Sequence, residues 1–154
     1  MTNVRDTEQG EERGERRDDA KERLGSLPTH MDLDEVKRQI QSESEWQQNG
    51  RNQYALFHSG ALRVGYFGFQ AGTGIEDHKV NGHLMIHVLQ GRVEVSGGGR
   101  TTETVGANQF LGMDGMKAFT IKAHEESYAI IAFVQADGVA EPARGNDQGT
   151  QITR

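Results

Sequence analysis

Three histidines lie close together in the sequence: His78, His83 and His87. Imidazole nitrogens bind Fe, Mn, Ni and Zn, but such a site needs three or more ligands that converge within about 2–2.3 Å of the ion. In a strand, His83 and His87 point to one face and Leu84 to the other. The three histidines can therefore share a metal only if a bulge near Asn81-Gly82 changes the register. Otherwise His83 and His87 face solvent, a second sheet or a partner chain.

The elements that would position these histidines are short strands. Glycine- and asparagine-containing turns, among them Asn81-Gly82 and Asp114-Gly115, separate segments of strand-like alternation. The plainest hairpin surrounds Gly97–Gly99. The predicted strands are 54–58, 61–70, 75–79, 83–89, 92–96, 100–105, 109–112, 117–123 and 127–135. Many short strands at regular spacing indicate an all-β barrel or sandwich. No pattern of a helical crossover is present, so a parallel sheet is not expected.

A short helix is predicted ahead of the strands, over residues 32–41, with Asp32 in the N-cap position. Its apolar side chains share one face, namely Leu33, Val36 and Ile40. Residues 42–53 are mostly polar and predict a linker, in which we expect Trp46 to cover an exposed edge of the barrel.

Both ends of the chain are poor in apolar side chains. They cannot bury enough surface to offset chain entropy, so we expect disordered tails over residues 1–28 and 137–154. The helix and linker then occupy residues 29–53, and the barrel occupies residues 54–136. A core of this size builds one domain and not two.

Composition excludes several classes of function. The chain has 154 residues, a net charge of −6 and no cysteine. Without cysteine it can form no disulfide, thiolate metal site or cysteine nucleophile. The acidic balance argues against a nucleic-acid partner. No apolar run is long enough to span a membrane or to form a signal sequence, so we expect a cytoplasmic protein with no membrane partner.

The stretch GTGIEDHKVNGHLMIHVLQG, from Gly72 to Gly91, resembles the first motif of the cupin superfamily. That motif places a Gly, two His, a Glu and a final Gly at set spacings. Gly72, His78 and Gly91 occupy their positions, whereas Val80 stands at the second His position and Leu84 at the Glu position.

Gly106 and the turn at 113–115 resemble the conserved glycine and the turn of the second cupin motif. Its His position falls at Ala118 or Phe119, and neither residue can bind a metal. The resemblance covers residues 54–135 and implies a single cupin-type jelly-roll β-barrel. It does not transfer the usual metal site of three histidines and one glutamate.

By resemblance, a ligand pocket lies inside the barrel and is lined by His78, Val80, Leu84 and Phe119. We therefore expect a small cupin that binds a small molecule without the usual metal and with no other cofactor. One alternative is a metal-dependent oxygenase or isomerase, with Fe, Mn, Ni or Zn held by a rearranged site of His78, His83 and His87. Another is a structural or stress-associated protein. No catalytic residue is assigned.

Aromatic and methionine side chains are expected to form the core and to line a cavity at the barrel mouth, suited to a small apolar or aromatic ligand. They are Tyr66, Phe67, Phe69, Met85, Phe110, Met113, Met116, Phe119, Tyr128 and Phe133. We also expect a homodimer, because open barrel edges need a cover and cupins commonly pair through their edges or exchange strands.

Overall fold

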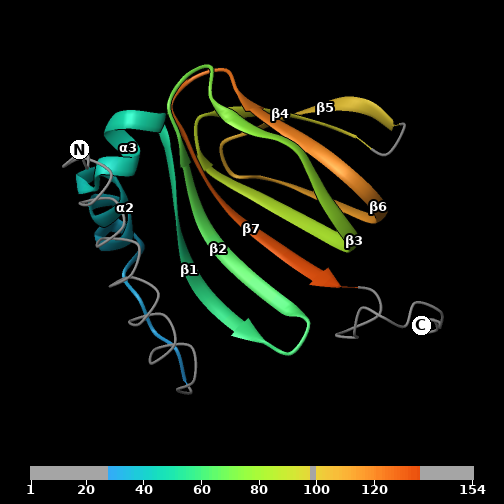
Figure 1. The fold of residues 1–154 in the computed structure, drawn as a ribbon, viewed down its shortest axis with the longest axis horizontal. Coiled ribbons are helices and arrows are strands. Elements are labelled where there is room, and N and C mark those ends of the chain that lie inside the picture. Colours follow the sequence, from blue (N-terminus) through green and yellow to red (C-terminus); the bar gives the residue numbers. More distant parts are fainter. Residues whose placement is uncertain (1–27, 98–99, 136–154) are drawn as a thin grey trace, which may run out of the picture.

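The strands form one strongly curled antiparallel sheet (Figure 1). The computed structural model describes residues 28–97 and 100–135. In this part of the chain the sheet has seven strands in the order β1-β2-β7-β3-β6-β4-β5. Their bounds are Arg51–Ser59 (β1), Leu62–Phe69 (β2), Gly74–Gln90 (β3), Arg92–Gly97 (β4), Arg100–Gly106 (β5), Gln109–Ala123 (β6) and Ser127–Gln135 (β7).

This architecture confirms the predicted all-β class. β7 has the predicted bounds, and β4 pairs with β5 as the predicted hairpin. β1 begins at Arg51, three residues before the predicted start of the barrel at 54. The predicted tails lie outside the described residues, except for Pro28. The edge strands of the sheet are β1 and β5, so the homodimer expected from open edges stays a prediction.

Two predicted turns proved to be wrong. Asn81-Gly82 lies inside β3, and Asp114-Gly115 lies inside β6. β3 and β6 pair with each other along their length, and the register shifts on either side of Gly82. Bulges therefore absorb the irregular residues, and both strands continue where a turn was expected.

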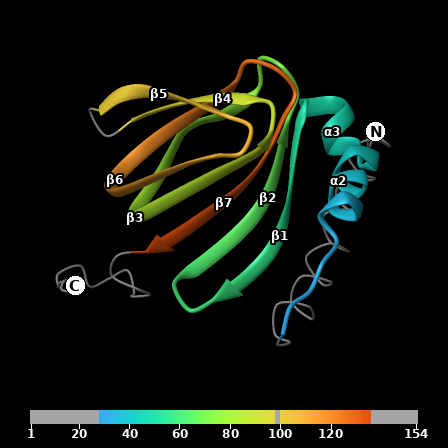
Figure 2. The same ribbon diagram turned by 180° about the vertical axis from the view of Figure 1, so that it is seen from behind.

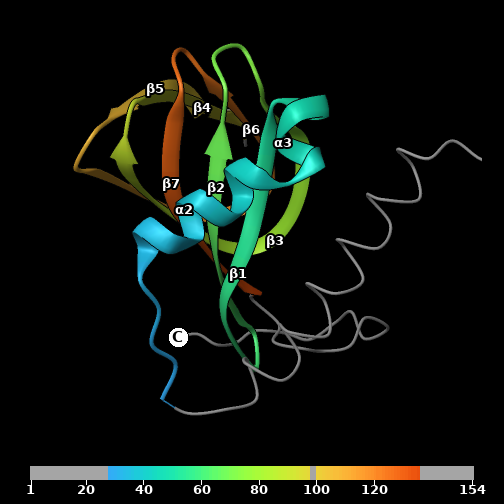
Figure 3. The same cartoon turned by 90° about the vertical axis from the view of Figure 1, so that its left-hand side faces the viewer.

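In the described part of the chain, two helices cover the outer face of β1, β2 and β7, on the side away from β4 and β5 (Figures 2 and 3). α2 spans Leu33–Ser42, and a carboxylate oxygen of its N-cap Asp32 accepts a hydrogen bond of 2.9 Å from the Asp34 amide. α3 spans Ser44–Asn49, where the sequence predicted a linker. Its end is set by Gly50, whose positive φ of 70° suits the hydrogen bond from its amide to the Trp46 carbonyl. Neither helix has the length and apolar character of a membrane span.

The side chains of the sheet divide between two cores. The inner core fills the barrel with alternate residues of every strand except β1, among them Phe69, Leu84 and Phe119. The outer core lies under the helices and consists of Val36, Ile40, Trp46, Tyr66 and Tyr128. The rings of Trp46 and Tyr128 are stacked with their centroids 5.9 Å apart, so Trp46 ties the helices to the outer face of β7.

The predicted aromatic lining of the barrel is therefore only partly correct. Strand alternation places Tyr66 and Tyr128 on the outer face, opposite their buried neighbours Phe67 and Ala129. Phe110 is 65% exposed and contributes to neither core.

Both outer-core tyrosines are held in their neutral form. Burial, together with the nearby charge of Asp34, raises the pKa of Tyr66 from 10.0 to about 12. Burial likewise raises the pKa of Tyr128 to about 12. The Tyr128 hydroxyl also accepts a hydrogen bond from Gln41, which lowers its pKa, and donates one to Glu126, which raises it.

These tyrosines predict a loss of stability at high pH. In the unfolded chain a tyrosine loses its proton near pH 10, whereas Tyr66 and Tyr128 keep theirs in the folded state until about pH 12. The folded state therefore binds more protons between these values, and the free energy of unfolding falls as the pH rises through this window. Urea unfolding of a Tyr66→Phe, Tyr128→Phe variant should show a shallower fall than the parent chain. Equal slopes would contradict this account.

Candidate functional site

His78 is the one histidine of the cupin-like motif that lies beside inward-facing aromatic side chains. Its ring centroid is 5.3 Å from that of Phe119 and 5.6 Å from that of Phe133, and the two phenylalanine rings are 6.0 Å apart. Phe119 is buried in the inner core and Phe133 packs against that core. His78 itself is exposed. These three rings, called the aromatic cluster below, combine an apolar floor with an accessible imidazole.

A bulge in β3 aims His78 at this cluster. Ile75 pairs with Ile121 and His78 with Phe119, so Glu76 and Asp77 together oppose Thr120. In a regular strand, two residues three positions apart, such as Ile75 and His78, would point to opposite faces. Both lie on the inner side: Ile75 belongs to the inner core and the His78 ring contacts Phe119.

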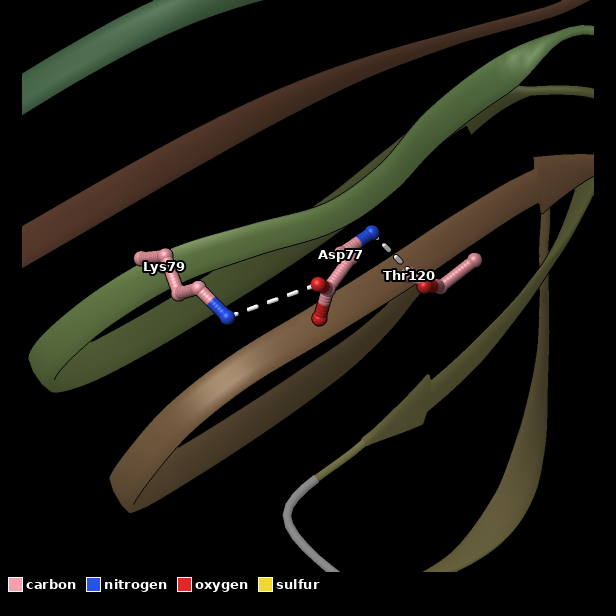
Figure 4. A network of polar contacts seen from close by, with 3 residues as sticks. All are labelled: Asp77, Lys79 and Thr120. Atoms are coloured by element: carbon pink, nitrogen blue, oxygen red, sulfur yellow. Dashed lines mark hydrogen bonds and ion pairs between the residues drawn. The ribbon is translucent and has the colours of Figure 1, made fainter.

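Asp77 carries the strain of the bulge. Its φ is +45°, a left-handed conformation that aspartate tolerates better than most residues. Its amide donates a hydrogen bond of 3.0 Å to the Thr120 Oγ1, and its carboxylate pairs with the Lys79 ammonium at 3.4 Å (Figure 4). Asp77 therefore shapes the strand near His78 while its own charge is directed to Lys79.

The other residues predicted to line the pocket belong to the packed interior. Val80 is 3% exposed, Leu84 0% and Phe119 1%. A side chain with no accessible surface borders no space large enough for a water molecule, so Leu84 is a core residue. Of the four predicted positions, His78 has the accessible surface. The sequence placed Phe133 among the aromatic residues of the barrel lining but did not pair it with His78, because their proximity depends on strands that are far apart in the chain.

His83 and His87 point away from His78. They alternate with the fully buried Leu84 and Ile86, so they lie on the outer face of β3. Within residues 28–97 and 100–135, no three His, Asp or Glu side chains are grouped to hold a metal ion. The rearranged metal site of His78, His83 and His87 is therefore not formed by these side chains.

The metal site that is usual in cupins also lacks its donors. Metal ions of this kind need several nitrogen or oxygen ligands around one point. The matching positions here hold one imidazole, His78, and the apolar side chains of Val80, Leu84 and Phe119. These residues do not fit a transition metal.

A separate cavity of about 640 Å³ lies between the start of α2 and β1. It is lined by His30, Met31, Asp32, Glu35, Val36, Gln39 and Tyr54. Asp32 already serves as the N-cap of α2, and Val36 is buried in the outer core. Among the described residues, the acidic side chains of this cavity do not belong to any group of three or more His, Asp or Glu side chains that could hold a metal ion.

The bulge predicts a specific pattern of tolerance at position 77. Asp77→Gly should be neutral or stabilising, because glycine adopts a positive φ without a steric penalty. Asp77→Val should cost about 1–2 kcal/mol, because a β-branched residue is strained in this conformation. Urea unfolding gives the free energies, and the NMR shifts of the His78 ring report whether it still lies on Phe119. If Asp77→Val is as stable as Asp77→Gly, the bulge is not under strain.

No family model matches the chain, and no curated protein matches its sequence. Solved structures do match its fold. A conserved protein of unknown function from Streptococcus pyogenes is 22% identical, with a TM-score of 0.52 over 57% of this chain and 76% of that one. A cupin superfamily protein from Desulfitobacterium hafniense is 16% identical, with a TM-score of 0.52 over 56% of this chain and 79% of that one.

A mutant of salicylate 1,2-dioxygenase from Pseudoaminobacter salicylatoxidans has a TM-score of 0.58 at 12% identity. The match covers 68% of this chain but 34% of the dioxygenase, so the matched part of this chain corresponds to about a third of that enzyme. At such identities the likeness concerns the fold and not the activity. With its curled antiparallel sheet and these structural neighbours, the chain has the cupin fold.

Proposed function

We propose that this chain is a cupin that binds a small molecule at the aromatic cluster and does so without a metal. The observation that supports this most directly is the contrast among the four ligand positions of the cupin motif. His78 is exposed, whereas Val80, Leu84 and Phe119 fill the other ligand positions of the motif with buried apolar side chains.

The chemistry of the cluster suits a ligand with a planar, partly apolar face. Aromatic pairs contribute about 0.5–1.5 kcal/mol beyond the burial of their area, and His78 and Phe133 both offer ring surface. The imidazole of His78 adds one hydrogen-bond donor and one acceptor when it is neutral. Rings alone would bind any apolar solute, so the hydrogen bonds of the imidazole are what would orient the ligand.

The alternative of a metal-dependent oxygenase or isomerase has less support. Such an enzyme uses the metal as a Lewis acid or to activate a bound molecule, and the metal needs several convergent ligands. His83 and His87, which would complete the set with His78, lie on the opposite face of β3. Binding therefore accounts for the side chains at the site better than metal catalysis does.

Metal content tests the first part of the proposal. The full-length chain, purified without a His-tag, should carry less than about 0.1 equivalent of Fe, Mn, Ni or Zn by elemental analysis, because a lone imidazole binds such ions weakly. Incubation with each metal followed by desalting should not raise this content. A stoichiometric metal that is lost in His78→Ala would overturn the proposal.

A neutral planar probe tests the second part. Titration with benzamide should shift the NMR resonances of His78 and Phe133 in a saturable way, and Phe133→Ala should weaken this binding. His83→Ala is the matched control, because His83 is exposed on the same strand but faces outward. Shifts that depend on His83 and not on Phe133 would locate the ligand on the wrong face.

A further inference from the structure

A cationic side chain lies in the same row of the sheet as the aromatic cluster. Arg63 on β2 is the direct cross-strand partner of Phe133 on β7, and His58 on β1 is the partner of Arg63. Directly paired residues of antiparallel strands share a face, with Cβ atoms about 4.5–5.5 Å apart. Because Phe133 packs against the inner core, Arg63 and His58 lie on this inner face as well.

Arg63 is available to a ligand. Its side chain is exposed, and within residues 28–97 and 100–135 the structure gives its guanidinium no ion-pair partner. The carboxylate next to His78 in the sequence, that of Asp77, is paired with Lys79. Arg63 is therefore a cation beside the aromatic cluster whose charge is not compensated by the described chain.

The pairing of an arginine with an aromatic surface defines a class of ligand. A guanidinium presents a planar fork of donors that matches a carboxylate, and the charge makes these hydrogen bonds stronger than neutral ones. The rings of His78 and Phe133 offer ring surface to a planar group. The net charge of −6 opposes the binding of an anion only weakly. Exposed charges that lie more than about 8 Å from the site are largely screened at physiological ionic strength.

We infer that the ligand of this site is a planar carboxylate, whose ring lies on the aromatic cluster and whose carboxylate is bound by Arg63. This inference rests on the proposed function and adds a ligand class and a specificity residue to it. His58 is the partner of Arg63 on the neighbouring strand β1 and lies on the same face. In this proposal it donates a second hydrogen bond to the same carboxylate.

Three probes with the same ring and different charges test this inference: benzoate, benzamide and benzylamine. NMR titration of the full-length chain, read at His78 and Phe133, gives the affinity for each. Benzoate should bind about tenfold more tightly than benzamide, because a charged hydrogen bond contributes more than a neutral one, and benzylamine should bind most weakly.

Variants of Arg63 assign this preference to its side chain. Arg63→Gln should reduce the affinity for benzoate to that for benzamide while leaving benzamide unchanged, and Arg63→Lys should restore part of the preference because it keeps the charge but lacks the fork. Arg38→Gln is the matched control, since Arg38 is an exposed arginine on α2. Circular dichroism and the melting temperature check that each variant is folded.

The outcomes separate the two proposals. If benzoate and benzamide bind equally well at His78 and Phe133, the proposed function stands and the carboxylate inference is wrong. The inference is also wrong if the preference for benzoate persists in Arg63→Gln. If none of the probes shifts His78 or Phe133, the proposed function fails and the inference fails with it.

Discussion

The inward and outward alternation of side chains along β3 has to change phase once, between Ile75 and His78, and much of the structure depends on that change. Ahead of it, Ile75 faces the inner core, and beyond it Val80 and Leu84 do so. A strand without the bulge could bury only one of these two sets. The left-handed conformation of Asp77 is thus a requirement of the core as much as of the site, and His78 faces inward as a consequence.

The same alternation decides which histidines can cooperate. It sends His78 toward Phe119 and Phe133, and it sends His83 and His87 to the outer face. What the inner face offers near His78 is therefore ring surface together with the cationic Arg63 from β2. These groups can select a ligand by shape and charge, and they contain no set of donors that would hold a metal.

The strand pattern and the cupin-like motif predicted the fold, because both depend on the spacing of residues that are close in the sequence. β7 and the β4–β5 hairpin lie where the two-residue alternation of apolar side chains indicated strands. α3 was missed because five of its six residues are polar and show no helical periodicity. It is held by the burial of Trp46 against Tyr128, a contact between distant segments. The turn assigned to Asn81-Gly82 was wrong because glycine and asparagine suit a bulge as well as a turn.

The site was predicted only in part, because some of its residues follow from local spacing and others from contacts between distant strands. His78 and Phe119 follow from the spacing of the motif, and the structure brings them together. Phe133 and Arg63 join them through the register of β7 with β3 and β2, which pairs residues about fifty to seventy positions apart and leaves no local signal. The packed state of Val80 and Leu84 also depends on the whole barrel.

The position of Trp46 gives the molecule a natural optical reporter. It is the only tryptophan of the chain, and it lies in the outer core, stacked on Tyr128 and separated by the sheet from the inner core. Its emission therefore follows the docking of the helices, while the far-ultraviolet dichroism of the strands follows the barrel. Unfolding recorded by the two signals together distinguishes a chain that folds as one unit from one whose helices detach first.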